Sequence, residues 1–225
     1  MEKSLHIFDM DETLVNGDCA SLWSAFLVEQ GIVTDPDYLA TDKALMVKYA
    51  KGELDMEEYI LYTLAPITTI PQHEIDNLVD EFVSTKILPL VFPEAITLIN
   101  ALNAKGIPCL VISATVTFIV KKVAKAIAIE DALGIDLVIE NGCYLNQVTG
   151  IATYREGKIL RLEQWLAEQK ISVEAIHFYS DSINDLPLCE YADYAYLVNP
   201  CERLSAEALK HPEWQVFDWG KSTVL

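Results

Sequence analysis

The chain has 225 residues, of which 52% are hydrophobic and 22% charged, and this composition excludes a disordered protein. Its 34 acidic and 16 basic residues give a net charge of −18, which excludes nucleic acid and anionic lipid as expected partners, because both attract basic surfaces. The five cysteines show no paired spacing, no leader is recognisable, and no uncharged stretch reaches the roughly 18 residues that span a membrane. We therefore expect a cytoplasmic protein, either a monomer or a homodimer.

The chain opens with a short apolar run, residues 4–9, that ends in an acidic residue, as a buried parallel strand does when its carboxyl end carries chemistry. The segment that follows changes to helical spacing, with apolar residues recurring every three or four positions. One such series is Ile75, Leu78, Val79 and Phe82. We therefore predict a small helical insert over residues 17–87, set into a core formed by residues 1–16 and 88–225.

After Pro89 the pattern becomes an alternation of strands and helices. Alternation of this kind predicts an α/β fold, a Rossmann-like doubly wound parallel sheet with helices on both faces. The helical insert then follows the first strand. The predicted strands are 108–113, 136–140, 174–180 and 194–198, and the predicted helices are 93–105, 115–127, 157–169 and 183–191. Residues 142–153 are predicted as a hairpin or two short strands around Gly150.

Three predicted strands end in polar residues, namely Asp9, Ser113 and Asp181. Each one alone is equally consistent with capping of the following helix. Ligands of parallel sheets bind outside the carboxyl ends of the strands, so three such residues on one sheet favour a functional site.

The first of these positions carries two carboxylates, Asp9 and Asp11, two residues apart. Like charges held this close need a cation, and Mg²⁺ prefers oxygen ligands. With a phosphate ester present, Asp9 is expected to attack phosphorus, and Asp11 to protonate the leaving oxygen and later activate water. The Ser113 hydroxyl and the N–H groups of Ala114 and Thr115, at a predicted helix start, can hold phosphate oxygens.

The remaining candidates lie later in the chain. Lys158, at the start of a predicted helix, opposes the helix dipole unless an anion neutralises it. Asp181 can bind the metal ion, and Asp185 can bind it through water or orient the lysine. Asn184 can donate to a phosphate oxygen.

In order along the chain, the motifs D-x-D-x-T-L, a strand-end serine, a lysine and S-D-S-x-N-D resemble the haloacid dehalogenase superfamily of aspartate-nucleophile phosphatases. The insert resembles the cap of the phosphoserine-phosphatase-like branch. The resemblance implies a Mg²⁺ cofactor, a small phosphorylated metabolite as substrate and an aspartyl-phosphate intermediate. The implied metal set is Asp9, Asp11 (through its backbone carbonyl), Asp181 and, as a supporting carboxylate, Asp185.

The insert departs from the phosphoserine phosphatases that it resembles. Their cap glutamate is replaced by Asp18, and Thr63 stands where their carboxylate-binding arginine is expected. No arginine occurs between residues 17 and 87, so a bidentate clamp for a substrate carboxylate is missing. The chain looks similar instead to bacterial histidinol-phosphate phosphatases, and Asp18 would suit an aminated substrate. Phosphoserine phosphatase, phosphomutase and a catalytically inactive phosphate-binding module remain alternatives.

Overall fold

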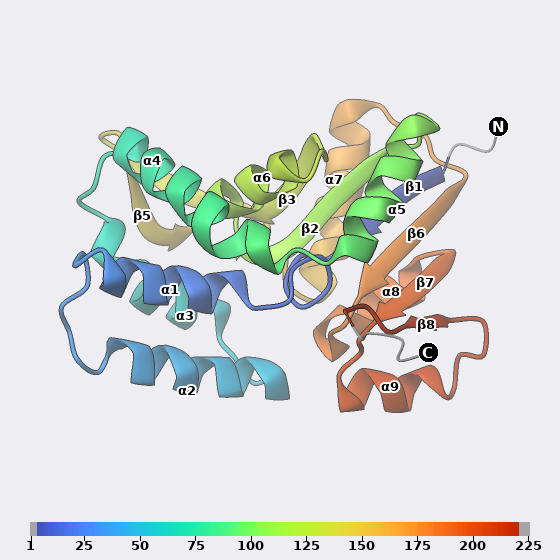
Figure 1. The fold of residues 1–225 in the computed structure, drawn as a ribbon, viewed down its shortest axis with the longest axis horizontal. Coiled ribbons are helices and arrows are strands. Elements are labelled where there is room, and N and C mark those ends of the chain that lie inside the picture. Colours follow the sequence, from blue (N-terminus) through green and yellow to red (C-terminus); the bar gives the residue numbers. More distant parts are fainter. Residues whose placement is uncertain (1–3, 221–225) are drawn as a thin grey trace.

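The computed structural model describes residues 4–220, so the predicted core segments 1–16 and 88–225 begin and end outside the described residues. Its centre is a six-stranded sheet in the order β3-β2-β1-β6-β7-β8, and every neighbouring pair is parallel (Figure 1). This confirms the predicted α/β class. The strands are β1 (Ser4–Phe8), β2 (Cys109–Val116), β3 (Asp131–Ile135), β6 (Ala175–Ser180), β7 (Tyr194–Val198) and β8 (Gln215–Phe217).

Helices cover both faces of this sheet, as the doubly wound prediction requires. One face packs on α5 (Pro93–Ala104) and α6 (Thr117–Ala126), and the other on α7 (Glu156–Gln169), α8 (Leu186–Tyr191) and α9 (Glu202–Ala208). Alternate residues of β1 supply the two cores: Leu5 and Ile7 lie in the second, and Phe8 in the first. This burial on both sides explains why the strands appear in the sequence as continuous apolar runs.

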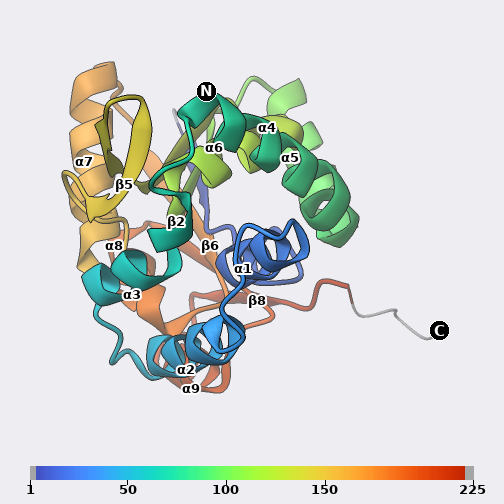
Figure 2. The same cartoon turned by 90° about the vertical axis from the view of Figure 1, so that its left-hand side faces the viewer.

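Between β1 and α5 the chain forms a group of helices, which lies in front of the sheet in Figure 2. An antiparallel hairpin, β4 (Leu137–Glu140) and β5 (Cys143–Val148), packs on this group, and the Asn146 side chain donates to the Leu61 carbonyl at 2.7 Å. The helices of the insert are α1 (Cys19–Glu29), α2 (Tyr38–Lys51), α3 (Met56–Thr63), a 3₁₀ turn (Ala65–Ile67), α4 (Gln72–Phe82), a π-helical turn (Val83–Ile87) and a 3₁₀ turn (Leu88–Leu90).

The segments that enter and leave the insert run side by side. Val15 and Val91 form an antiparallel bridge, Asn16 N–H donates to the Leu90 carbonyl at 2.8 Å, and Phe92 N–H donates to the Leu14 carbonyl at 3.0 Å. The insert is therefore attached to the core through a narrow two-stranded connection.

The predicted elements between 115 and 153 need correction. Strand β2 continues to Val116, so the helix begins at Thr117 and not at Thr115. The strand predicted at 136–140 exists as β4 but belongs to the hairpin, and the parallel strand is the preceding segment, β3. The hairpin turns at Asn141-Gly142, both with positive φ (51° and 78°), the conformation that this dipeptide favours, and not around Gly150. Helix α9 and strand β8, of seven and three residues, were not predicted.

Strand β3 carries a glycine where the backbone of β2 and α6 comes close. A Cβ atom on Gly134 would lie 2.7 Å from the Thr115 carbonyl oxygen and 2.8 Å from the Thr117 nitrogen. Both neighbours are backbone atoms, which cannot rotate away as a side chain can. Glycine at this position therefore fixes the spacing of the strand end that carries Ser113.

We expect Gly134→Ala to lower the free energy of unfolding by about 1–3 kcal/mol, because the added methyl overpacks a rigid contact, and to lower activity by displacing the Ser113–Thr115 segment. Denaturant unfolding and a phosphatase assay measure the two effects. Gly31→Ala is the control, because its Cβ would meet open space. Its positive φ of 70° costs stability only. Unchanged activity in Gly134→Ala would contradict the expectation.

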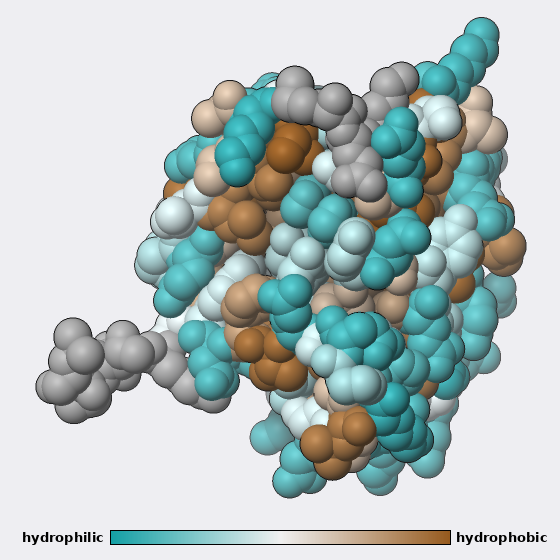
Figure 3. All heavy atoms as spheres, turned by 90° about the vertical axis from the view of Figure 1, so that its right-hand side faces the viewer, coloured by the Kyte–Doolittle hydropathy of each residue, from teal (hydrophilic) through white to brown (hydrophobic). Residues whose placement is uncertain are grey.

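The surface away from the insert shows hydrophobic patches separated by hydrophilic side chains (Figure 3). No helix within residues 4–220 is long and apolar enough to cross a bilayer.

Candidate active site

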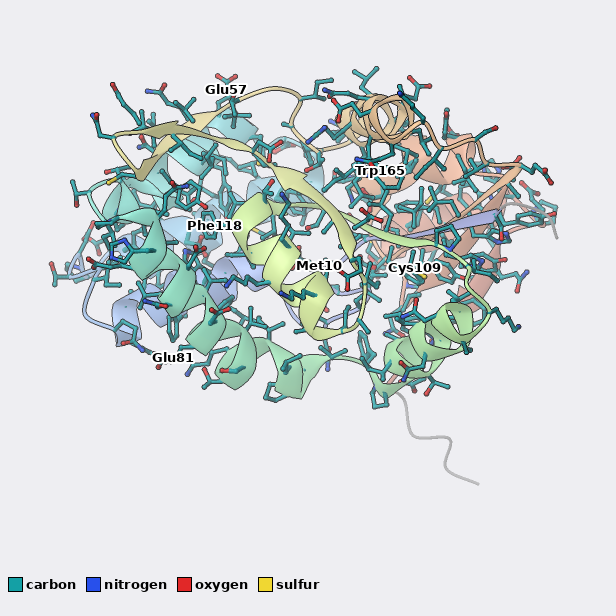
Figure 4. The ribbon with its side chains drawn as sticks, turned by 90° about the horizontal axis from the view of Figure 1, so that it is seen from above. Met10, Glu57, Glu81, Cys109, Phe118 and Trp165 are labelled. Carbon is teal, nitrogen blue, oxygen red and sulfur yellow. The ribbon has the colours of Figure 1, made fainter. Side chains whose placement is uncertain are left out.

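The candidate residues lie at the carboxyl edge of the sheet, where β1 is flanked by β2 and β6. Asp9 directly follows β1, Ser113 lies in β2, and Asp181 directly follows β6. Seen from above, Met10, the residue after Asp9, lies between Phe118 and Trp165 (Figure 4). The insert lies on the Phe118 side, and most of the core lies on the Trp165 side. The site is therefore formed where the insert meets the core.

A buried lysine joins two of the predicted carboxylates. The Lys158 Nζ lies 2.8 Å from Asp9 Oδ1 and 2.7 Å from Asp185 Oδ1, and the lysine is only 2% exposed. Ser180 donates to Asp185 at 2.7 Å. Burial alone would lower the pKa of Lys158, but Asp185 and Asp9 outweigh it and raise the pKa above its ordinary value, so the ammonium is charged. Of the two roles that the sequence allows for Asp185, these contacts correspond to orienting the lysine.

Asp11 is held by hydrogen bonds from both the core and the insert. Its Oδ2 accepts from the hydroxyls of Ser113 (3.0 Å) and Thr115 (2.9 Å), and its Oδ1 accepts from the Cys19 backbone N–H (2.7 Å). Thr115 N–H donates to Ser113 Oγ and lies in β2, so it is not the free amide of a helix start that the sequence suggested. Ser113 thus lies in direct contact with the predicted acid/base.

Burial raises the pKa values of two carboxyl groups of the site, Asp181 and Asp9. Asp181 accepts from Thr13 Oγ1 at 3.1 Å, and burial followed by the charge of Asp185 raises the pKa of Asp181 to about 8. Burial also raises the pKa of Asp9 well above its ordinary value, against the opposing effect of Lys158. Bringing a divalent cation to these oxygens would favour their ionised forms.

The predicted metal set is only partly assembled by side chains. Among residues 4–220 no three acidic, histidine or cysteine side chains converge as a metal-binding group. The Asp185 side chain is held by Lys158 and Ser180, and the Asp11 side chain by its three donors. Asp9 and Asp181 remain, together with backbone oxygen. Such a set fits Mg²⁺, which typically takes one or two carboxylates and completes its shell with water and phosphate.

The remaining predicted site residues, Asn184, Asp18 and Ala114, contact the insert or lie beside it. The Asn184 side chain donates to the Tyr49 carbonyl of the insert at 3.1 Å. Asp18 is the N-cap of α1 and accepts from Ser21 N–H at 2.7 Å. Burial and the charge of Asp11 raise the pKa of Asp18 to about 7. Ala114, at the end of β2, lines a small cavity between α1, α3 and α6.

Sequence reasoning missed several contacts of the site. Thr13 and Ser180 were assigned no role, but Thr13 donates to Asp181 and Ser180 donates to Asp185. Thr115 was expected to act through its N–H, whereas its hydroxyl donates to Asp11. Tyr49 of α2 is close enough to the site that, after burial, the charges of Asp185 and Asp9 raise the pKa of Tyr49 well above its ordinary value. The D-x-D-x-T motif offered a signal for Thr13, whereas nothing in the local sequence distinguishes Tyr49 from the other tyrosines of the insert.

The model of the haloacid dehalogenase-like hydrolases matches residues 7–190, a span that includes every candidate residue. The chain therefore belongs to this family of hydrolases. Within the family it is a phosphatase, because relatives that match most of its length are phosphatases.

Similar proteins agree with this class. The chain is 34% identical to a histidinol-phosphatase of Neisseria meningitidis serogroup C over 96% of this chain and 99% of the relative. It is 27% identical to a phosphoserine phosphatase of Lactococcus lactis, covering 84% and 81% of the two chains. A Bordetella pertussis protein of unknown function has a similar crystal structure, with a TM-score of 0.89 at 30% identity and 97% and 99% coverage. A substrate-bound phosphoserine phosphatase shares the fold, with a TM-score of 0.67 at 19% identity and 94% and 99% coverage.

Proposed function

We propose that this phosphatase is a Mg²⁺-dependent phosphomonoesterase of the cytoplasm that forms an aspartyl-phosphate on Asp9, with residues 17–87 acting as its cap. The observation that carries the proposal is the buried Lys158 ammonium between Asp9 and Asp185. A charged lysine fixed against one oxygen of Asp9 orients the carboxylate and can neutralise an arriving phosphate.

The proposed reaction has two steps. An Asp9 carboxylate oxygen attacks phosphorus, the ester P–O bond breaks, and Asp11 gives its proton to the leaving alcohol oxygen. Water then attacks phosphorus while Asp11 takes a water proton, and the bond between Asp9 and phosphorus breaks to release inorganic phosphate. In this proposal Ser113 and Lys158, which contact Asp11 and Asp9, donate to the phosphate oxygens. The Ala114 backbone N–H and the second N–H of the Asn184 amide are further candidate donors to phosphate.

Asp9 and Asp181, with the Asp11 carbonyl, are the proposed ligands of Mg²⁺. When bound, Mg²⁺ would supply positive charge against the phosphoryl oxygens.

For the substrate we propose an amino-alcohol phosphate such as histidinol phosphate. Asp18 and Asp42 are acidic side chains of the insert near the site, and within residues 4–220 neither forms an ion pair with a basic residue. Asp42 is 4% exposed and accepts from hydroxyls, among them those of Ser24 and Tyr59. Buried carboxylates without a cation suit a cationic substrate group. The lack of arginine between residues 17 and 87 argues against phosphoserine.

Asp18→Asn tests the substrate proposal, because asparagine can still cap α1 but carries no charge. We expect the KM for histidinol phosphate to rise about tenfold, equivalent to roughly 1.4 kcal/mol, since the amino group loses its counterion. The KM for p-nitrophenyl phosphate, which has no amino group, is expected to stay the same. Steady-state kinetics with both esters measure the difference, and an equal change for both would contradict the assignment.

A screen of the purified protein against phosphorylated metabolites, with Mg²⁺ and with EDTA, tests the reaction itself. Release of inorganic phosphate only in the presence of Mg²⁺ is the expected outcome. Transfer of phosphate to a second acceptor would identify a phosphomutase, and binding without turnover would identify an inactive phosphate-binding module. A preference for phosphoserine would overturn the substrate proposal but not the proposed chemistry.

A further inference from the structure

Helix α2 of the insert ends against the core. Both Figure 1 and Figure 2 show the end of α2 beside α9. The last carbonyl groups of a helix have no partner within it and must bond elsewhere. Here side chains from three separate core elements supply the donors. The contacts are Asn184 Nδ2 to Tyr49 O (3.1 Å), Arg203 Nη1 to Lys51 O (3.0 Å) and Ala50 O (3.4 Å), and Arg155 Nη1 to Gly52 O (3.3 Å).

The charges in this contact are complementary. The C-terminal end of a helix carries a partial negative charge, and Arg155 and Arg203 bring positive charge to it. Within residues 4–220 neither arginine has a carboxylate within ion-pair distance. The two guanidinium groups are thus available to the helix end, in a chain whose net charge of −18 would offer many acidic partners.

Asn184 connects this contact to the catalytic residues. It is 3% exposed and directly precedes Asp185, which holds Lys158. Arg155 lies three residues before Lys158, at the start of the same helix, with a positive φ of 54°. Two of the three donors therefore belong to the segments that carry the site, so the position of α2 and the geometry of the site depend on each other.

The contact lies away from the attachment of the insert. The insert is joined to the core at the Val15–Val91 bridge, whereas α2 is held by residues 155, 184 and 203. Hydrogen bonds to exposed guanidinium groups are readily exchanged for water, so this second attachment can open while the first remains.

We infer that Arg155 and Arg203, together with Asn184, form a latch that holds the cap closed over the site, and that the two arginines are positioning residues for catalysis. The inference rests on the proposed function, in which the substrate reacts beneath the cap. Breaking the latch should open the end of α2 and weaken substrate binding more than it slows the chemical step, because the arginines do not contact the reacting groups.

The test compares the double variant Arg155→Ala/Arg203→Ala with Arg161→Ala. Arg161 lies on α7 and pairs with Asp136 instead of α2. Hydrogen exchange is measured for the amides of Gly52 and Glu53, which close the end of α2 on the Tyr49 and Lys48 carbonyls. We expect about tenfold faster exchange at these amides in the double variant, with residues 38–45 at the other end of α2 unchanged. Arg161→Ala is expected to behave as the wild type.

Kinetics with histidinol phosphate or any other ester that is turned over provide the second readout. The double variant should have a KM about tenfold higher and a kcat changed less than threefold. The single variant Arg203→Lys should raise KM less than the single variant Arg203→Ala. Unchanged exchange at Gly52 and Glu53, or a fall in kcat at constant KM, would overturn the latch. Because exchange is measured without substrate, a wild-type protein that hydrolyses no ester would refute the proposed function and leave the latch result standing.

Discussion

Asp9→Asn is expected to lower kcat by about 10⁴-fold or more, because an amide oxygen is a poor nucleophile for phosphorus. The neutral side chain still fits beside Lys158, so Mg²⁺-dependent binding of inorganic phosphate should persist. Single-turnover kinetics measure the first effect and titration calorimetry the second.

The matched control for this variant is Asp37→Asn, an exposed residue before α2 whose side chain makes no capping hydrogen bond. It should keep wild-type kinetics. If Asp9→Asn kept activity within tenfold of the wild type, the phosphate would have to be transferred directly to water, and the proposed intermediate would be wrong.

Lys158→Met is expected to cause the largest loss of stability, about 3–5 kcal/mol near pH 7, together with loss of activity. Methionine fills a similar volume, but Asp9 and Asp185 are then left buried without their ammonium group, at 6% and 2% exposure. The loss should shrink as the pH falls, because burial raises the pKa of Asp9, which becomes neutral by taking up a proton. Urea unfolding at pH 5 and pH 7 measures both effects.

Lys210→Met provides the comparison, because its ion pair with Glu207 is exposed and such pairs contribute about 0–1 kcal/mol. A loss below 1 kcal/mol at pH 7 for Lys158→Met would mean that the ion pairs around Lys158 do not stabilise the protein.

Much of the fold follows from the sequence because strands buried on both faces leave a strong signal. The apolar runs of β1, β2, β6 and β7 and the polar residues that end them place Asp9, Ser113 and Asp181 at one edge. Strand β3 gave no such signal, because its sequence D-A-L-G-I contains a glycine and an acid, and Gly134 is required by a contact with another segment. Local sequence does not encode a contact of that kind.

Partner choice within the site was also beyond the sequence. The residue types at positions 158, 184 and 185 indicated phosphate chemistry, and the contact of Asp185 with Lys158 corresponds to one of the two roles expected for it. Asn184, however, donates to a carbonyl 135 residues away. Such choices depend on how the insert sits on the core. They become visible only when segments distant in the chain are placed together.

The paired connection at Val15 and Val91 has a consequence for how this architecture can vary. A chain that leaves and returns through neighbouring hydrogen-bonded residues closes its own gap, so the intervening helices can be exchanged for a different module, or for a tight turn, without altering the register of β1 in the sheet. The position of β1 in the sheet therefore does not depend on which helices fill this gap, whereas the contacts of Arg155, Asn184 and Arg203 with α2 would have to be replaced whenever the helices change.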